Sequence, residues 1–283
     1  MSRNNMDRTG APPADAPIQQ QAESNFNPLS FVAPTELVDL PSKGKGYPAS
    51  HPLHNKETVE IKFMTAKDED ILASQSLIKK GVVIERFIEN ILLDKNIKPK
   101  DMLTGDRNAV IIAARISGYG AEYETKINCP SCQANSRFEF DLNDQKIHET
   151  EVSGDLGLAH VEDGLFQTTM PFSKFKIKFK LLKGADEIYL AKLMDNKRKG
   201  RLQESVLTDQ MKRLIVEIEG HTDRKIINKY VDNMPTLDSR HLRTCYKLAN
   251  PDVKVTNIFT CPSCGFEEGM EVPFGADFFW PDR

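Results

Sequence analysis

The chain has 283 residues, and at roughly 150 residues per domain this length predicts about two domains. Its 38 Lys and Arg residues are balanced by 41 Asp and Glu residues, and the net charge of -3 excludes a uniformly basic, nucleic-acid-binding surface. No stretch approaches the roughly 18 consecutive apolar residues of a membrane span. The start of the sequence lacks the apolar segment of a secretory signal, so we expect a soluble protein made in the cytoplasm, with no membrane partner.

The first part of the chain is predicted to form no regular element. Residues 1–34 are rich in Asn, Gln, Ala and Pro and have no hydrophobic period, so they cannot bury enough surface to offset the entropy of ordering. We predict a disordered arm. This arm either docks on a partner through a short apolar segment or serves only as a spacer. Residues 35–57 are predicted to form an extended strap, because they contain Pro41, Gly44, Gly46 and Pro48.

An ordered pattern begins at Thr58, where alternating apolar residues predict a half-buried strand. A helix is predicted from Thr65 to about Lys80, closed by Gly81, and a second helix should end before Pro99. A third helix is predicted over about residues 107–117, stopping at Gly118. The CPSC motif over residues 129–132 lies between two alternating segments, which predicts a β-hairpin that carries both cysteines.

The same order of elements recurs later in the chain, which indicates an internal duplication. Asp186 follows an alternating strand as Asp68 follows the first one, at an offset of 118 residues, whereas the two CPSC motifs are offset by 132. The difference predicts one insertion of 14 residues, placed in the basic stretch over residues 192–204. One helical face of the second copy is predicted to consist of Met211, Leu214, Ile215 and Ile218.

These patterns predict an α+β fold of two tandem pseudo-symmetric repeats. The repeats are assigned to residues 58–150 and 172–283, with a linker over residues 151–171. Each repeat is expected to contain a strand, about three helices and a β-hairpin bearing a CPSC zinc knuckle. Two domains of related plan would account for the length of the chain.

The cysteines carry the strongest chemical signal of the sequence. Four of the five form two Cys-x-x-Cys pairs: Cys129, Cys132, Cys261 and Cys264. A structural zinc ion takes four thiolates in a tetrahedron, and each pair can supply two of them from one tight turn. In a zinc ribbon the pairs lie about 15–20 residues apart, whereas 128 residues separate Cys132 from Cys261. We therefore predict one structural Zn2+ that joins the two repeats.

Three alternatives to this shared site stay open from the sequence. The pairs could form a disulfide each, they could be two half-sites completed by another subunit, or the hairpins could have lost the metal. A redox function is disfavoured, because reactive Cys-x-x-Cys motifs open a helix, whereas these lie between predicted strands. Cys245 falls on a predicted helix and is interpreted as a buried packing residue.

Two further features are candidates for binding a partner protein. The strand KFKIKFK presents Lys174, Lys176, Lys178 and Lys180 on one face. Such a face is often simply solvated, and an acidic protein is the next interpretation, because interleaved exposed aromatics for base stacking are lacking. The C-terminal aromatics Phe278, Phe279 and Trp280 are predicted either to close the core of the second repeat or to anchor a neighbouring protein.

Catalytic motifs are not found in the sequence, so we expect that the protein is not an enzyme. The six histidines form no HxxxH or HExxH pair, and a Gly-x-Ser-x-Gly elbow is missing. The Asp-Glu pairs stand at predicted helix starts, where the helix dipole explains them.

Three stretches of sequence resemble a known family. LVDLPSKGKGYPASHPL, then VEIKFMTAKDEDILASQSLIKKG, then AARISGYG followed by CPSC are similar to the baseplate hub proteins of contractile-tailed bacteriophages of the T-even-like group. The resemblance covers about residues 36–142 strongly and the second copy more loosely. It implies a virion or assembly component at the hub of the tail baseplate, assembled in the host cytoplasm and bound to other baseplate and hub proteins.

Two other classes of function remain as alternatives. A zinc-ribbon protein could bind nucleic acid through the Lys-rich strand, and its affinity would fall steeply with salt. A transient hub-assembly chaperone would be absent from finished particles. We do not expect nucleic acid as a partner, because the basic stretch lacks stacking aromatics.

Overall fold

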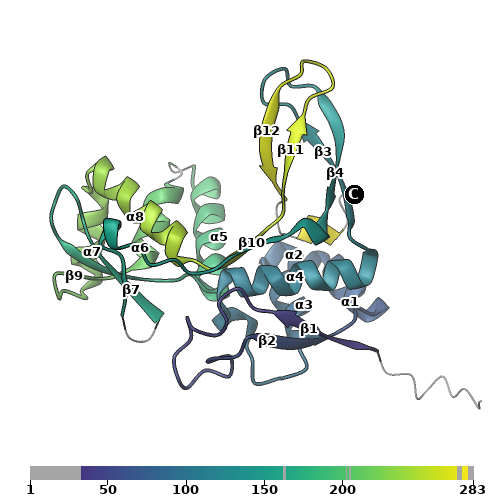
Figure 1. Cartoon of the computed structure of the whole chain (residues 1–283), viewed down its shortest axis with the longest axis horizontal. Coiled ribbons are helices and arrows are strands. Elements are labelled where there is room, and N and C mark those ends of the chain that lie inside the picture. The colour runs from purple at the N-terminus through teal and green to yellow at the C-terminus, as the bar shows by residue number, and fades with distance from the viewer. Residues whose placement is uncertain (1–32, 162–163, 202, 204, 273–275, 280–283) are drawn as a thin grey trace, which may run out of the picture. The chain divides into compact units, whose positions relative to one another are not determined.

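The computed structural model describes residues 33–279 except 162–163, 202, 204 and 273–275. The predicted arm therefore lies outside the described residues, apart from residues 33 and 34. Along residues 33–279, groups of helices lie between short antiparallel strand pairs, which gives the α+β fold class predicted from the sequence (Figure 1). These residues belong to a single unit, Ala33–Arg283.

The first half of this unit runs from a strand pair through four helices to a β-hairpin. Its elements are β1 (Thr35–Asp39), β2 (Thr58–Lys62), α1 (Ala66–Ala73), α2 (Gln75–Lys80), α3 (Val83–Ile91), α4 (Thr104–Tyr119), β3 (Glu122–Asn128), β4 (Asn135–Asp141) and β5 (Lys146–His148). Short 3-10 helices lie at Pro99–Asp101 and Leu142–Asp144. The hairpin β3–β4 has Thr125 opposite Phe138.

The second half follows a similar order and also ends in a β-hairpin. Its elements are β6 (Ala159–His160), β7 (Leu165–Thr169), β8 (Lys176–Lys180), α5 (Gly184–Lys199), α6 (Val206–Leu214), β9 (Ile215–Ile218), α7 (Arg224–Asp232), α8 (Thr236–Ala249), β10 (Asp252–Lys254), β11 (Thr256–Thr260) and β12 (Glu267–Glu271). Short 3-10 helices lie at Gly154–Leu156 and Ala276–Phe279. Strands β6, β7, β8 and β9 form one antiparallel sheet in this order.

The predicted strap contains one strand and the predicted linker contains two, none of which the sequence pattern indicated. The strap begins with β1, which pairs antiparallel with β2 and sets Val38 opposite Val59. The linker contains β7, which pairs with β8 and sets Phe166 opposite Phe179. Proline does not prevent either pairing, because β1 ends before Pro41 and β7 ends before Pro171. Both segments therefore pair with the strand that begins the predicted repeat after them.

A capping aspartate recurs at the first helix of each half. Asp68 in α1 accepts a hydrogen bond from the backbone N–H of Thr65 at 2.9 Å. Asp186 in α5 accepts one from the N–H of Lys183 at 3.1 Å. Both aspartates are buried, and they lie 118 residues apart. A helix start fixed by a carboxylate at the third helical position is thus found in both halves.

A second buried aspartate in each half holds a loop, the one after β1 in the first half and the one after β7 in the second. Asp106 in α4 accepts hydrogen bonds from the N–H (3.0 Å) and hydroxyl (2.7 Å) of Ser42. Asp238 in α8 accepts them from the N–H groups of Phe172 (2.7 Å) and Ser173 (3.0 Å). These aspartates are 132 residues apart, the offset of the CPSC motifs. The arrangement is compatible with two copies of one structural plan.

The predicted insertion divides into two parts. Ile61 bridges to Leu92 after α3, and Phe179 pairs with Ile215 after α6, so the offset rises from 118 to 123 residues across these pairs. The remaining rise to 132 falls between β9 and α8, where the second half has the additional helix α7. Most of residues 192–204 lie in α5, which matches α1 and α2 together. These pairs favour two smaller insertions, of which the first, between Phe179 and Ile215, spans the predicted stretch.

A predicted helical face in the second half is also wrong in part. Met211 and Leu214 lie on α6, but Ile215 and Ile218 belong to β9. The segment Ile-Val-Glu-Ile is rich in β-branched residues, which suit a pleated surface. Strand β8 offers it a free edge, and Ile177 of β8 lies opposite Ile218. Helical periodicity extended through the segment by chance, and pairing with β8 decided its structure.

The two halves share one hydrophobic core, which includes Leu103, Val110 and Phe179. Backbone hydrogen bonds join the halves as well, for example from the N–H of Thr104 to the carbonyl of Leu182 at 3.2 Å. Strand β5 of the first half pairs with β10 of the second. The halves are therefore held together independently of the cysteines.

The backbones of the two halves approach closely at Gly105 in α4. A Cβ atom at this position would lie 2.0 Å from the carbonyl oxygen of Pro251 and 2.7 Å from the Cα of Asp252. Because both neighbours are backbone atoms, a side chain can be accommodated only if α4 moves away from β10. Asn108, one turn along α4, also donates a hydrogen bond to Asp252 at 3.0 Å.

Replacement of Gly105 with alanine is expected to lower the free energy of unfolding by about 1–3 kcal/mol, the usual cost of overpacking a core. Denaturant-induced unfolding followed by circular dichroism measures this change. Gly154→Ala is the matched control, because no heavy atom lies within 4 Å of its added Cβ. Equal effects of the two substitutions would contradict the close approach at Gly105.

Candidate metal centre

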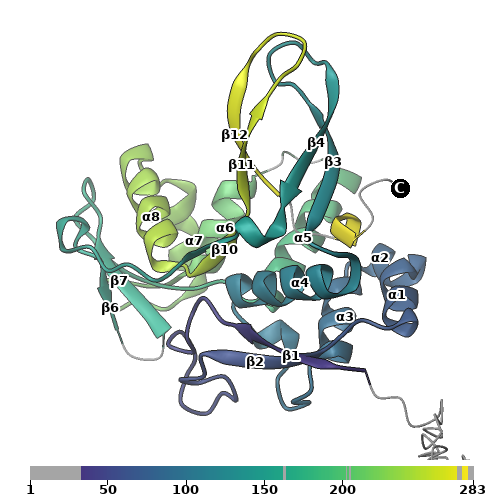
Figure 2. The same ribbon diagram turned by 45° about the vertical axis from the view of Figure 1, so that its right-hand side comes forward.

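The two β-hairpins, β3–β4 and β11–β12, lie side by side and project from the rest of the unit (Figures 1 and 2). Each carries its Cys-x-x-Cys pair in the turn at its end. The hairpins contact one another through Phe138 of β4 and Phe259 of β11, whose ring centroids are 5.6 Å apart in an edge-to-face arrangement. Cys129, Phe259 and Cys261 form a small buried cluster there, separate from the main core.

The two turns have the same backbone structure. The N–H of Gln133 donates to the carbonyl of Cys129 at 2.9 Å, and the N–H of Gly265 donates to the carbonyl of Cys261 at 2.9 Å. The residue after the second cysteine is left-handed in both turns, with φ of 61° at Gln133 and 70° at Gly265. Glycine adopts this conformation without strain, whereas glutamine does so at some cost. A common turn geometry thus overrides the sequence difference.

The turns bring all four predicted cysteines together. The sulfur of Cys129 lies 3.7 Å from that of Cys264, and the sulfur of Cys132 lies 3.7 Å from that of Cys261. All four sulfur atoms lie within 4.8 Å of one another, and all four cysteines are free thiols. In a tetrahedral site with metal–sulfur distances of about 2.3 Å, neighbouring sulfurs are about 3.8 Å apart. The cluster therefore fits a four-thiolate metal ion.

The cluster also favours the anionic form of at least one sulfur. The pKa of the Cys261 thiol is lowered to about 6: burial raises it, but hydrogen bonds from the N–H groups of Ser263 and Cys264 and from neighbouring thiols outweigh burial. The pKa of the Cys132 thiol is raised to about 12, because hydrogen bonds with the other sulfurs outweigh a backbone hydrogen bond that lowers it. Four adjacent thiolates need a cation, and a bound metal ion displaces their protons.

The fifth cysteine lies elsewhere, on α8, as the sequence predicted. Cys245 is fully buried, and its sulfur is 3.5 Å from Nε2 of His241 and 3.7 Å from the hydroxyl of Thr168. Burial raises the pKa of this thiol. Cys245 therefore packs as a protonated side chain in the core of the second half.

The lysines of the predicted basic face differ in what they contact. Lys174 and Lys176 are exposed. Lys178 forms an ion pair with Glu217 of β9 at 2.9 Å, and Lys180 forms one with the buried carboxylate of Asp186 at 2.8 Å. The last two lysines thus take part in internal contacts that the alternating pattern did not indicate. Lys174 and Lys176 remain candidates for binding a partner.

The C-terminal aromatics contact the first half. Phe278 and Phe279 are 1% and 2% exposed. Phe279 packs edge-to-face on Phe87 of α3, with ring centroids 5.0 Å apart, and Phe278 lies at the same distance from Tyr123 of β3. Their rings are therefore part of the core and offer no surface to a neighbour, and the core they close is not that of the second repeat alone. Trp280 lies outside the described residues.

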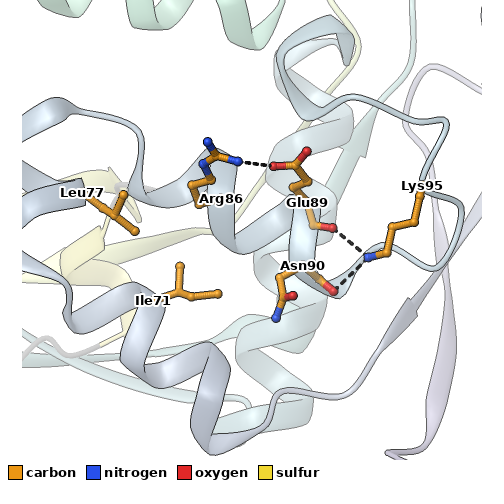
Figure 3. A pocket seen from close by; sticks show the side chains of 6 residues that line it. All are labelled: Ile71, Leu77, Arg86, Glu89, Asn90 and Lys95. Atoms are coloured by element: carbon orange, nitrogen blue, oxygen red, sulfur yellow. Dashed lines mark hydrogen bonds and ion pairs between the residues drawn. The ribbon is translucent and has the colours of Figure 1, made fainter.

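A surface cavity of about 420 Å3 lies between α1, α2 and α3 (Figure 3). Ile71 and Leu77 form its apolar side, and the carboxylate of Glu89 binds Arg86 at 2.9 Å. The Lys95 ammonium donates to the carbonyls of Glu89 and Asn90 at the end of α3. The charged groups drawn here are bound to one another or to the backbone, so the cavity presents no pair of nucleophile and base.

Comparison with known protein families and structures identifies the family of the chain. In the part of the chain that the structure describes, no helix combines the length and apolar character needed to cross a bilayer. Searches of curated protein sequences and of solved structures return no significant match. The profile of one family, described as T4 bacteriophage base plate protein, matches residues 33–280. The match spans both halves of the chain and both cysteine hairpins, and the chain therefore belongs to the T4 bacteriophage base plate protein family.

Proposed function

We propose that this protein is a structural subunit of the baseplate hub, assembled in the host cytoplasm and retained in the virion tail. Membership of the base plate family supports a structural subunit that binds other tail proteins. The resemblance of residues 36–142 to hub proteins favours the hub within the baseplate. No turnover of a substrate is needed for this role.

We further propose that the four-cysteine cluster holds one structural zinc ion within a single chain. The observation that carries this proposal is the pair of 3.7 Å sulfur contacts, each of which joins one hairpin to the other. Four thiolates complete the shell of a structural zinc ion, so no open position is left for a substrate. Because a shared core already holds the halves together, the ion would fix the two hairpins against each other.

A rigid pair of hairpins suits a subunit that bears mechanical load. Hairpins of two strands are marginally stable on their own, and these two share only a small cluster around Phe259. A metal ion at their ends would restrict hinge motion where the apolar contact is smallest. The hairpins then form one arm that could contact a neighbouring subunit.

The placement in the virion is tested by quantitative mass spectrometry of purified particles and of infected-cell lysate. We expect the protein in finished particles, with chemical cross-links to hub proteins at the baseplate centre. Presence in lysate and absence from particles would instead identify an assembly chaperone. Cross-links confined to peripheral baseplate proteins would contradict a position in the hub but would still support a position in the baseplate.

A further inference from the structure

An exposed apolar patch lies in the second half, at the turn between β7 and β8 and on the adjoining α7 and α8. Phe172 is 66% exposed, Leu237 55%, Ile226 44% and Phe175 41%. Tyr230 of α7 connects them, because its ring lies 5.7 Å from Phe175 and Ile226 precedes it by one helical turn. Apolar side chains gathered at one place on a surface are typical of a binding site. We name Phe172, Phe175, Ile226, Tyr230 and Leu237 the turn patch.

The turn patch is held in place by partly buried hydrogen bonds. The carboxylate of Asp238 accepts the N–H groups of Phe172 and Ser173, at 2.7 and 3.0 Å. The Ser173 hydroxyl is 3.1 Å from the hydroxyl of Tyr230, which ties the turn to α7. Asp238 is fully buried. The exposed rings therefore lie on a fixed backbone, which lowers the entropy cost of binding.

The corresponding place in the first half is covered by the chain itself. There the rest of the strap, after β1, forms a long loop, and its Tyr47 and Leu53 are 2% and 0% exposed. The Tyr47 hydroxyl donates to Asp106 at 2.7 Å, as the Tyr230 hydroxyl approaches Asp238 at 3.5 Å. The second half has a short turn in place of the strap, and its aromatic residues stay open to solvent. A partner could supply the cover that the strap provides in the first half.

The charges around the turn patch indicate what that partner carries. Lys174 lies between the two phenylalanines, Lys229 is one helical turn from Ile226, and Arg240 is one helical turn from Leu237. All three are exposed, and within the described residues none forms an ion pair. The nearby Asp232 is paired with Lys212 at 2.5 Å. The exposed carboxylates of Glu219, which accepts the N–H of Lys176, and Asp223, one helical turn before Ile226, also lie near the patch. The exposed Lys176 and Lys225 offset these two charges, so the rim is positive in net charge.

We propose that the turn patch binds an acidic segment of a partner protein, with apolar side chains on the patch and carboxylates on Lys174, Lys229 and Arg240. Single-stranded nucleic acid fits less well, because Ile226 and Leu237 have no aromatic face for base stacking. The residues of the patch lie outside the cysteine hairpins, so the inference depends neither on the metal ion nor on the position in the hub.

The proposal is tested by fluorescence anisotropy with the full chain and a labelled 12-residue peptide in which aspartate alternates with leucine and phenylalanine. One control peptide has lysine in place of aspartate, and another has serine in place of the apolar residues. A 12-nucleotide oligothymidylate is the nucleic-acid probe. We expect the acidic apolar peptide to bind at least about tenfold more tightly than either control peptide, and more tightly than the oligonucleotide.

Two variants assign the binding to the turn patch. Phe172→Ser with Leu237→Ser, and Lys229→Glu with Arg240→Glu, should each weaken peptide binding about tenfold without changing the unfolding midpoint, since all four side chains are exposed. Ile258→Ser is the matched control, because Ile258 is 66% exposed on hairpin β11–β12.

Three outcomes would overturn the proposal. These are peptide binding that is absent or insensitive to both patch variants, tighter binding of the oligonucleotide, and a concentration-dependent dimer in sedimentation that the patch variants abolish. The last result would assign the turn patch to a second copy of this chain.

Discussion

Replacing Cys129 with serine should abolish zinc binding and loosen both hairpins at once. Elemental analysis of the wild-type protein, purified under reducing conditions, should give one zinc per monomeric chain. The variant should give close to none, because a three-thiolate site is incomplete and structural zinc requires four ligands. Cys261→Ser should have the same effect, although its position is 132 residues away.

The stability of the protein should fall when the metal ion is removed. A bound ion stabilises only the folded hairpins, so its removal withdraws the free energy of binding from folding. A loss of about 3 kcal/mol would lower Tm by roughly 6–12 °C in a chain of this size. A chelator added to the wild type should reproduce the lower Tm. Hydrogen exchange should rise in residues 122–141 and 256–271, while the core around α4 keeps its protection.

Cys245→Ala is the control for loss of a cysteine outside the cluster. It should keep one zinc per chain, although the small cavity in the core will lower stability. A zinc content near zero in the wild type would show that the hairpins do not hold this metal. A content near two would contradict a shared site, and one zinc per chain in an obligate dimer would indicate sites completed between chains.

Asp106→Ala should be among the most destabilising substitutions that leave the metal in place. Three buried donors lose their acceptor: the N–H and hydroxyl of Ser42 and the hydroxyl of Tyr47, which is 2.7 Å from the carboxylate. Each unsatisfied buried group costs about 1–3 kcal/mol, so the free energy of unfolding should fall by at least about 3 kcal/mol. Urea-induced unfolding monitored by circular dichroism measures the difference.

Asp106→Asn separates the role of the hydrogen bonds from that of the charge. Burial raises the pKa of Asp106, and the nearby Asp252 adds to the increase, against the hydrogen bonds from Ser42 and Tyr47. Between the ordinary value of 3.8 and this raised pKa, the folded state binds more protons at Asp106 than the unfolded state does. Stability from this group therefore declines as pH rises through that window.

The asparagine variant should lack this decline, so its stability relative to the wild type should improve as pH rises from about 4. It retains one acceptor oxygen and should lose less stability than the alanine variant. A pH-independent difference between wild type and Asp106→Asn would contradict a raised pKa. Equal stability of the alanine variant and the wild type would contradict the buried network itself.

Local rules were sufficient for several elements. Thr65 and Asp68 start α1 as a capping pair, and Gly81 ends α2 with φ of 66°. The single helix predicted between them is wrong in one respect, because it is broken at Ser74, whose backbone is extended. Alternation around the first CPSC motif correctly predicted its hairpin, because strand pairing across a short turn uses neighbours in sequence. Recurrence of the motif correctly predicted the second hairpin. The α4 helix extends to Tyr119, past the predicted stop at Gly118. Gly118 packs on Met64 inside the helix, and Gly120 ends the helix.

Other elements depend on contacts that no local pattern contains. Strands β1 and β7 form because β2 and β8 offer edges to pair with, and Ile215 leaves the helical pattern for the same reason. Phe278 and Phe279 are buried by Phe87 and Tyr123, residues more than 150 positions earlier in the chain. The exposed state of the turn patch likewise follows from the absence of a second strap.

The sequence by itself determined the ligand chemistry of the candidate metal centre: two cysteine pairs, each in a tight turn at the end of a hairpin. Only the tertiary structure decided that sulfurs 135 and 129 residues apart approach to 3.7 Å. It also decided that the halves share a core, so that the cysteines join hairpins and not whole repeats. The physical reason is range: turns and caps are set by residues within a few positions, whereas burial and sulfur contacts depend on the packing of distant segments.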